Sequence, residues 1–158
     1  MKKKNKDSLD NCEEKYDFME VAASLAKENV VSGLGGPFGA VIVSNNKIIG
    51  CGQNKVTLNN DPTAHAEIVC IRRAGRRRDW DSLTLVSTLS PCIMCSGTTL
   101  LFGIKRVFVG ENKSFLGAEA LMCSNGVQVT VLNDQRCIEL MERMQREKPG
   151  LWAEDIGK

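Results

Sequence analysis

The chain contains a single histidine, His65, and Glu67 follows it two residues later. Further along lies a Pro-Cys-x-x-Cys motif that contains Cys92 and Cys95. An imidazole and two thiolates are ligands that zinc prefers, and three protein ligands leave the fourth tetrahedral position open for water. The sequence therefore predicts a catalytic zinc site with His65, Cys92 and Cys95 as its ligands.

The charges of these ligands indicate why a carboxylate should lie beside them. Two thiolates and a neutral imidazole cancel the charge of the zinc ion, so the metal should acidify water less than a three-histidine site would. A general base is then needed, and Glu67 is placed to be one. Taken singly, a Cys-x-x-Cys motif is often a redox pair or half of a structural zinc site, and a lone histidine is often a core residue. Glu67 and the lack of a fourth ligand with suitable spacing favour the catalytic interpretation.

Two helices are expected to bring these side chains together. Asp61, followed by a proline, is typical of the cap of a helix over residues 64–74. Ser90, also followed by a proline, is typical of the cap of a helix over residues 92–102, and the apolar segment 83–89 before it predicts a buried strand. We therefore expect two helix N-termini to face the metal, where their dipoles favour thiolates.

The composition is that of an ordinary globular domain, with 158 residues, 42% of them hydrophobic and 25% charged. A net charge of +2 implies no strong attraction to nucleic acid or to a membrane surface. Seven cysteines without framework spacing favour a reducing compartment, so we expect a cytoplasmic protein. The basic start lacks the apolar segment of a secretory signal, and no apolar run is long enough to span a membrane. The basic residues 72–78 are interpreted as a solvated helix end, with a phosphate-binding patch as the alternative.

The alternation of helices and strands predicts an α/β domain. Asn45 and Asn46 are typical of a two-residue hairpin turn. The other elements expected from apolar periodicity are helices over residues 16–31, 115–124 and 134–146 and strands over residues 38–43, 47–52, 106–110 and 127–131. They predict a mixed sheet with helices on both faces. We assign residues 1–12 to a disordered segment, residues 13–158 to one domain, and residues 150–158 to a C-terminal lid.

The His-x-Glu and Pro-Cys-x-x-Cys motifs resemble those of the cytidine deaminase-like superfamily. Residues 88–95, residues 109–112 with Phe115, and residues 152–157 are similar to the yeast-type cytosine deaminases, and the resemblance covers nearly the whole chain after residue 12. It implies a three-layer α/β/α sandwich with a five-stranded mixed sheet, a bound zinc ion and a homodimer. It also implies a free nucleobase as substrate, with cytosine hydrolysed to uracil and ammonia.

The resemblance also assigns polar roles around the substrate. Glu67 would shuttle protons, and Asn54 would hydrogen-bond the ring edge of the base. The backbone N–H of Ala66 would contact the base, and Ser90 would accept from the exocyclic amine through its carbonyl. The carboxylate of Asp155 would be a second acceptor for the same amine.

The resemblance also implies aromatic walls for the site. This sequence departs from the family at some of the site positions. Phe115 and Trp152 would form the walls, and Trp152 lies three residues before Asp155, so both can face one cavity from a helix. Phe38 stands where the family has a smaller aliphatic residue, and Ala66 replaces a glycine. Residues 60–67 look more like guanine deaminases and tRNA adenosine deaminases. Guanine, isocytosine and related small amino-heterocycles therefore stay open as substrates, and a nucleic-acid substrate is less favoured because of the lid.

Overall fold

The computed structural model describes residues 10–158, with side chains from Phe18 onward. At its centre is a five-stranded sheet with the strand order β2-β1-β3-β4-β5. The strands are β1 (Gly39–Ser44), β2 (Lys47–Gln53), β3 (Thr84–Leu89), β4 (Arg106–Glu111) and β5 (Gln128–Val131). β1 pairs antiparallel with β2 and with β3, whereas β3, β4 and β5 are parallel. The sheet is therefore mixed, as expected.

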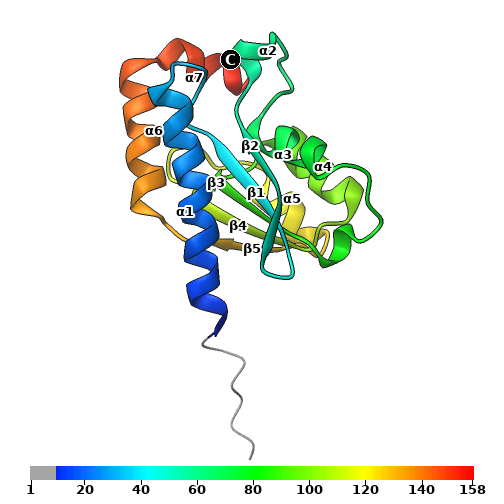
Figure 1. The fold of residues 1–158 in the computed structure, drawn as a ribbon. Coiled ribbons are helices and arrows are strands. Elements are labelled where there is room, and N and C mark those ends of the chain that lie inside the picture. The colour runs from blue at the N-terminus through cyan, green and yellow to red at the C-terminus, as the bar shows by residue number, and fades with distance from the viewer. Residues whose placement is uncertain (1–9) are drawn as a thin grey trace, which may run out of the picture.

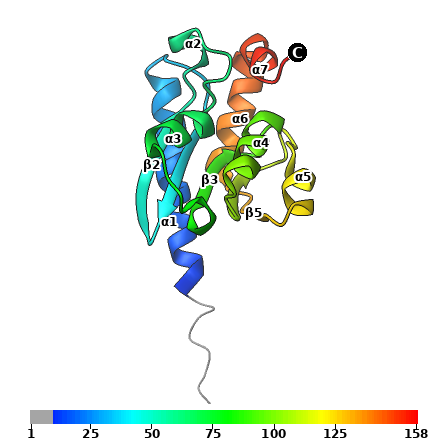
Figure 2. The same cartoon turned by 90° about the vertical axis from the view of Figure 1, so that its right-hand side faces the viewer.

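Helices cover both faces of this sheet (Figures 1 and 2). One face is covered by α1 (Asp10–Val31) and α6 (Gln135–Glu147), and the other by α3 (Ala66–Ala74), α4 (Ile93–Phe102) and α5 (Glu119–Ser124). Two short helices, α2 (Val56–Asn59) and α7 (Pro149–Asp155), lie at the same end of the sheet. A single 3-10 turn, Trp80–Ser82, precedes β3. The predicted three-layer sandwich is confirmed.

Side chains of the central strands alternate between the two helical layers. In β1, Ala40 and Ile42 belong to the core cluster that includes Cys70 of α3. The intervening Val41 belongs to the second cluster, which includes Met19 of α1. Because both faces of the sheet are buried, the central strands are apolar along most of their length.

The predicted hairpin turn is confirmed between β1 and β2. Asn45 and Asn46 have φ angles of 46° and 60°, both in the left-handed region. A two-residue turn of this kind requires positive φ at both positions, and asparagine tolerates it better than most residues.

Helices α1 and α5, the C-terminal tail and, by one or two residues, several other elements begin elsewhere than the sequence predicts. Helix α1 begins at Asp10, before the predicted residue 16. Of the predicted disordered segment, residues 1–9 lie outside the described residues and the rest opens α1. Helix α5 begins at Glu119, because the preceding loop is bonded to neighbouring segments. The C-terminal tail is already helical from Pro149, a residue suited to the first helical position.

Candidate active site

The three predicted zinc ligands meet where two helices begin. His65 directly precedes α3, Cys92 directly precedes α4, and Cys95 lies in the first turn of α4. Nδ1 of His65 lies 3.5 Å from the sulfur of Cys92 and 3.7 Å from that of Cys95, and all the ligand atoms lie within 4.8 Å of one another. Nitrogen and sulfur ligands of a tetrahedral zinc ion are about 3.6 Å apart, so the arrangement fits this ion. These three side chains, the zinc-binding group, could therefore hold a zinc ion.

The predicted helix caps at this group are wrong. Helices α3 and α4 start later than expected, so His65 and Cys92 hold the N-cap positions instead of Asp61 and Ser90. Neither His65 nor Cys92 forms a side-chain capping bond, which leaves both side chains available to a metal. The Ser90 hydroxyl instead donates to Glu119 at 2.7 Å.

The ligands influence one another's protonation. A hydrogen bond from the Cys95 thiol, with a further one from His65, lowers the pKa of Cys92 to about 4. The same bond, together with burial, raises the pKa of Cys95. Burial disfavours the charged form of His65, but its bond to Cys92 and the charge of Glu67 outweigh this and raise its pKa. The arrangement thus favours the thiolate form of Cys92, and zinc binding would displace the protons that remain on the ligands.

Glu67 lies buried in the first turn of α3, next to the zinc-binding group. Its Oε1 atom accepts a hydrogen bond from the Ser87 hydroxyl at 3.0 Å, and its Oε2 atom accepts one from the Cys95 thiol at 3.5 Å. Burial raises the pKa of this carboxyl group. A fixed carboxylate within reach of the metal is the arrangement that proton transfer requires.

A cavity opens beside Glu67, with about 400 Å³ of empty space that includes its open mouth. All the predicted base-binding residues line it: Phe38, Asn54, Ala66, Ser90, Phe115, Trp152 and Asp155. The other lining residues are His65, Glu67, Ser87, Thr88, Leu89, Cys92 and Ile156. The structure therefore brings the predicted base-binding residues together with Glu67 and two of the zinc ligands.

Three aromatic rings form one side of this cavity. The ring centroid of Trp152 lies 5.9 Å from that of Phe38, with the planes tilted by 35°. It lies 5.7 Å from that of Phe115, edge-on at 85°. The rings come from the segment before β1, from the loop between β4 and α5, and from α7, so this wall joins three distant parts of the chain.

The sequence model of one protein family, described as "Cytidine and deoxycytidylate deaminase zinc-binding region", matches residues 12–111. The match contains the zinc-binding group and Glu67, and it ends before Phe115. The chain belongs to this family. Its reaction class is therefore hydrolytic deamination.

Several deaminases are similar in sequence over much of the chain. A cytosine deaminase of Candida albicans is 43% identical over 143 residues, which are 89% of this chain and 95% of that protein. A guanine deaminase of Bacillus subtilis is 47% identical over 94 residues, 58% of this chain and 60% of that protein. A tRNA-specific adenosine deaminase of Buchnera aphidicola (subsp. Baizongia pistaciae) is 46% identical over 115 residues, 71% of this chain and 69% of that protein.

Solved structures agree with the fold of this deaminase. One, from a study of tRNA:A34 deaminases, matches with a TM-score of 0.71 at 29% identity, over 79% of this chain and 99% of that chain. The structure of the Bacillus subtilis guanine deaminase matches with a TM-score of 0.59 at 40% identity, over 68% of each chain.

Asp155 is the least satisfied polar group of the deaminase cavity. Its side chain is buried, and neither carboxylate oxygen has a hydrogen-bond partner among the residues described. Burial raises the pKa of Asp155 to about 6, although His65 and the amide of Asn54 act in the opposite direction. Such a carboxylate is ready to accept hydrogen bonds from a ligand.

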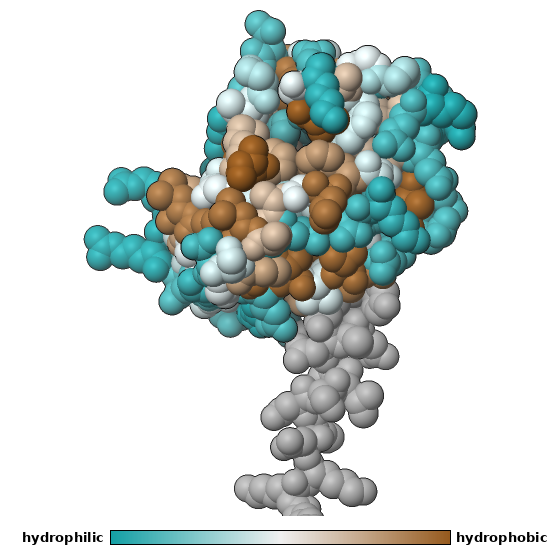
Figure 3. Space-filling model, turned by 180° about the vertical axis from the view of Figure 1, so that it is seen from behind, coloured by the Kyte–Doolittle hydropathy of each residue, from teal (hydrophilic) through white to brown (hydrophobic). Residues whose placement is uncertain are grey.

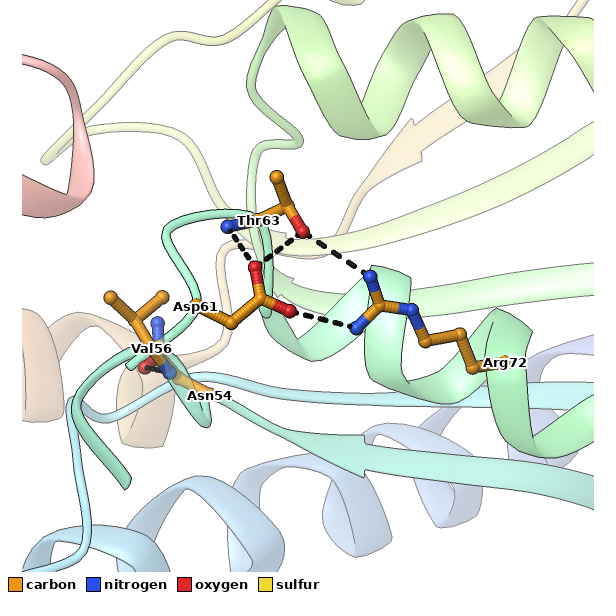
Figure 4. A network of polar contacts seen from close by, with 5 residues as sticks. All are labelled: Asn54, Val56, Asp61, Thr63 and Arg72. Carbon is orange, nitrogen blue, oxygen red and sulfur yellow. Dashed lines mark hydrogen bonds and ion pairs between the residues drawn. The ribbon is translucent and has the colours of Figure 1, made fainter. Parts of the chain in front are cut away.

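Asn54 is held in place from two directions. Its Oδ1 atom accepts from the backbone N–H of Val56 at 3.2 Å (Figure 4), and its backbone carbonyl accepts from Asn29 of α1 at 2.9 Å. Asn29 also donates to the carbonyl of Gly36 at 2.8 Å. The side-chain oxygen of Asn54 is therefore already engaged, and its amide N–H₂, which also acts on Asp155, is the part of the side chain left to donate.

Asp61 stabilises the loop before His65 and does not cap helix α3 (Figure 4). Asp61 accepts from the backbone N–H and the hydroxyl of Thr63 at 2.9 Å and 2.7 Å, and it pairs with Arg72 of α3 at 3.2 Å. Two more of the basic residues 72–78 have protein partners. Arg73 donates to the carbonyl of Cys51, and Arg77 pairs with Asp79.

Some lining residues were missed from the sequence. Ser87, Thr88 and Leu89 line the cavity from β3, and Ile156 lines it from the C-terminal end. Two adjacent hydroxyl residues at the C-terminal end of a buried strand were a usable signal, because the strand leads directly into the metal motif. No local pattern marks Asn29, whose partners are distant in sequence.

Proposed function

We propose that the protein is a zinc-dependent deaminase of a free nucleobase, and that its substrate is cytosine, which it converts to uracil and ammonia. The observation that carries this proposal is the buried, unpartnered carboxylate of Asp155 in the cavity wall. Leaving such a group unsatisfied is costly, and the amino group of a base supplies the N–H donors that it lacks. The similarity to a cytosine deaminase over 95% of that protein's length supports cytosine in particular.

The chemistry would combine the metal with one carboxylate. Bound zinc would act as a Lewis acid and lower the pKa of a water molecule next to the base. Glu67 is placed to take a proton from this water and deliver it to the ring nitrogen, because its carboxylate lies beside Cys95. After the hydroxide has added to the carbon that bears the amine, Glu67 would move the proton of the new hydroxyl group to the exocyclic nitrogen. The carbonyl then forms as the C–N bond breaks and ammonia leaves.

Four other residues would orient the base. The Ser90 carbonyl and the Asp155 carboxylate would accept from the exocyclic amine, which points this group toward the metal. The backbone N–H of Ala66 and the side-chain amide of Asn54 would meet acceptors on the ring edge. All four line the same cavity, which supports these roles.

The aromatic wall favours a free base over a polymer. Trp152 contacts both Phe38 and Phe115, and it belongs to the segment 150–158 that we propose as a lid. A nucleotide within RNA or DNA would have to displace this segment to reach the metal. Three arginines of residues 72–78 are bonded within the protein, which also weighs against a nucleic-acid partner.

Guanine is the second candidate substrate. The Bacillus subtilis guanine deaminase is 47% identical over the matched 94 residues, and Ala66 lies in the segment that resembles such enzymes. Phe38 favours cytosine, which has one ring, over guanine, which has two, because its contact with Trp152 narrows the cavity.

Ammonia release from cytosine, isocytosine, guanine, adenosine and an RNA hairpin would test the assignment. We expect cytosine to have the highest kcat/KM. A higher value for guanine would favour the second candidate substrate. A higher value for the RNA would contradict the role of residues 150–158 as a lid. No ammonia release from any of the compounds would contradict the proposal as a whole.

We also propose that the deaminase is a homodimer. Several large apolar residues of α4 and the segment through α5 are exposed: Ile93, Leu101, Phe102, Leu116 and Leu121. Figure 3 shows apolar side chains gathered on the face seen from behind. A large exposed apolar patch is typical of a protein–protein interface. Sedimentation of the wild type and of Leu101→Lys would test this, with a monomeric variant as the expected result.

A cytoplasmic location is proposed from the cysteines. Those whose side chains are described, Cys51, Cys70, Cys92, Cys95, Cys123 and Cys137, are all free thiols. Free thiols fit a reducing compartment. Within the described part of the chain, none of the helices is long and apolar enough to cross a membrane.

A further inference from the structure

Glu111, the last residue of β4, is a fully buried carboxylate that has no part in the chemistry proposed above. Its Oε2 atom accepts hydrogen bonds from the backbone N–H groups of Lys113 at 2.7 Å and Ser114 at 3.0 Å. Its Oε1 atom is buried without a hydrogen-bond partner among the residues described. Burying a carboxylate that is only half satisfied is unfavourable, so an apolar residue would fill this position at lower cost.

The two N–H groups that Glu111 binds begin an irregular loop, residues 112–118, between β4 and α5. The far end of this loop is also held. The N–H of Gly117 donates to the Ser90 hydroxyl at 2.9 Å, and the N–H of Ala118 donates to the Pro91 carbonyl at 3.0 Å. The loop is therefore fixed at both ends by segments that belong to the site.

Phe115 lies between these two attachments and directly follows Ser114. Its ring lines the cavity and meets Trp152 edge-on, at a centroid distance of 5.7 Å. The bond from Ser114 to Glu111 thus fixes the backbone one residue before the aromatic wall. A bond to a charged acceptor is roughly twice as strong as a neutral one, which suits a carboxylate to this task.

We propose that Glu111 is a positioning residue for substrate binding, whose carboxylate orders the loop that carries Phe115 before a base arrives. The inference rests on the proposed function, since it requires the base to occupy the cavity. A loop that is already ordered loses less conformational freedom on binding. Loss of the acceptor should therefore raise KM and the Kd of the product uracil, and it should change kcat much less.

Three substitutions at Glu111 distinguish the effect of its hydrogen-bond acceptor from the effect of its side-chain volume. Glu111→Met keeps the length of the side chain and removes the acceptor, and we expect KM to rise about tenfold, equivalent to about 1.4 kcal/mol. Glu111→Gln keeps a carbonyl acceptor but loses the charge, so its KM should lie between the values of the wild type and of Glu111→Met. Glu111→Asp keeps the charge on a side chain too short to reach both N–H groups, and it should behave like Glu111→Met. Glu142→Met, at an exposed position of α6, is the matched control and should change nothing.

Repeating the substitution in a Phe115→Ala protein decides whether Glu111 acts through Phe115. If it does, Glu111→Met should cause no further loss of uracil binding in that background, since coupled residues are not additive. An equal loss in both backgrounds, at full zinc content, would overturn the role of Glu111. If Glu111→Met does not fold, Glu111→Asp takes its place in the same cycle. If the proposed function itself were wrong, the wild type would neither release ammonia nor bind uracil. That result would overturn both proposals, whereas a failure of the Glu111 proposal alone leaves the wild type active.

Discussion

Two sides of the same cavity are built from different kinds of structure. The metal-binding side lies at the beginnings of two helices that pack on the sheet, and its residues are His65, Glu67, Cys92 and Cys95. The aromatic side lies on the segment before β1, an irregular loop and the short helix α7, and its residues are Phe38, Phe115 and Trp152.

This difference separates the reaction from the choice of substrate. The family match spans residues 12–111, so it includes the whole metal-binding side but only Phe38 of the aromatic side, and it ends before Phe115 and Trp152. Helix beginnings packed on a sheet leave little freedom to a metal ligand, whereas loops and terminal helices change without disturbing the core. We infer that the metal-binding side sets hydrolytic deamination and that the aromatic side selects the base.

The largest effect is expected from the zinc ligands. His65→Ala and Cys92→Ser should each lose the bound zinc and all measurable turnover, because two ligands do not hold the ion tightly. Elemental analysis of the purified proteins would measure the zinc content. Cys51→Ser is the matched control, since Cys51 is a free thiol outside the group, and it should keep one zinc per chain. Full zinc in His65→Ala would remove His65 from the ligand set.

The next largest effect should come from Glu67. Glu67→Gln keeps the shape of the side chain and its bond to Ser87, so zinc content and thermal stability should stay near the wild-type values. An amide does not carry a proton, so kcat should fall by about a hundredfold or more. Steady-state kinetics on zinc-loaded protein would measure this. A variant with zinc and near-normal kcat would show that some other group moves the proton.

The sequence predicts the metal-binding side well because its residues lie in two short motifs. Spacing was enough to group His65 with Cys92 and Cys95, and the structure places their ligand atoms together. The same local reasoning placed the helix caps wrongly. Asp61 and Ser90 are good caps by residue type, but each is bonded to another partner, and the metal ligands take the cap positions.

The aromatic side could not be derived from local pattern. Phe115 and Trp152 were assigned by family resemblance, because no periodicity relates residues in a loop to residues in a terminal helix. Asn29 and Glu111 were missed altogether as supporting residues. Their partners lie on other segments or on backbone atoms, which residue types and spacing do not reveal.

A moderate effect should come from Asp155, which joins the two sides through the substrate amine. Asp155→Ala removes an acceptor and would leave a buried donor of the substrate unpaired, at a cost of about 1–3 kcal/mol. We expect kcat/KM for cytosine to fall by the corresponding factor, about five- to 150-fold. The inhibition constant of uracil, which lacks the amine, should change less. Kinetics with both ligands would measure the difference.

The neighbouring Glu154 supplies the control for this comparison. Its side chain is exposed, so Glu154→Ala should leave both constants unchanged. If Asp155→Ala weakened substrate and product equally, Asp155 would only anchor α7, and selection of the base would then rest on the aromatic rings alone.

The smallest effect concerns Asp134, which belongs to neither side. Its carboxylate caps α6 through the backbone N–H of Arg136 at 3.0 Å and also pairs with the Arg136 guanidinium. Asp134→Ala should reduce the free energy of unfolding by about 1 kcal/mol, the usual contribution of such a cap. KM should not change, because the cavity lies at the other end of α6, where α7 follows. A raised KM would show that the aromatic side depends on the stability of α6. Base selection would then not be confined to the residues that line the cavity.

The pH dependence of this last effect follows from the direction of the pKa shift. The bonds to Arg136 lower the pKa of Asp134 below its ordinary value of 3.8, so the folded protein favours the ionised form. The stabilisation is present above the ordinary pKa and is lost as the pH falls through the lowered one. Urea unfolding should show the full difference between wild type and Asp134→Ala at about pH 7 and a smaller one at about pH 3. Zinc release in acid affects both proteins alike and cancels in the difference. Asp134→Asn is the matched control: asparagine caps a helix about as well as aspartate but does not titrate, so its difference from Asp134→Ala should stay constant with pH.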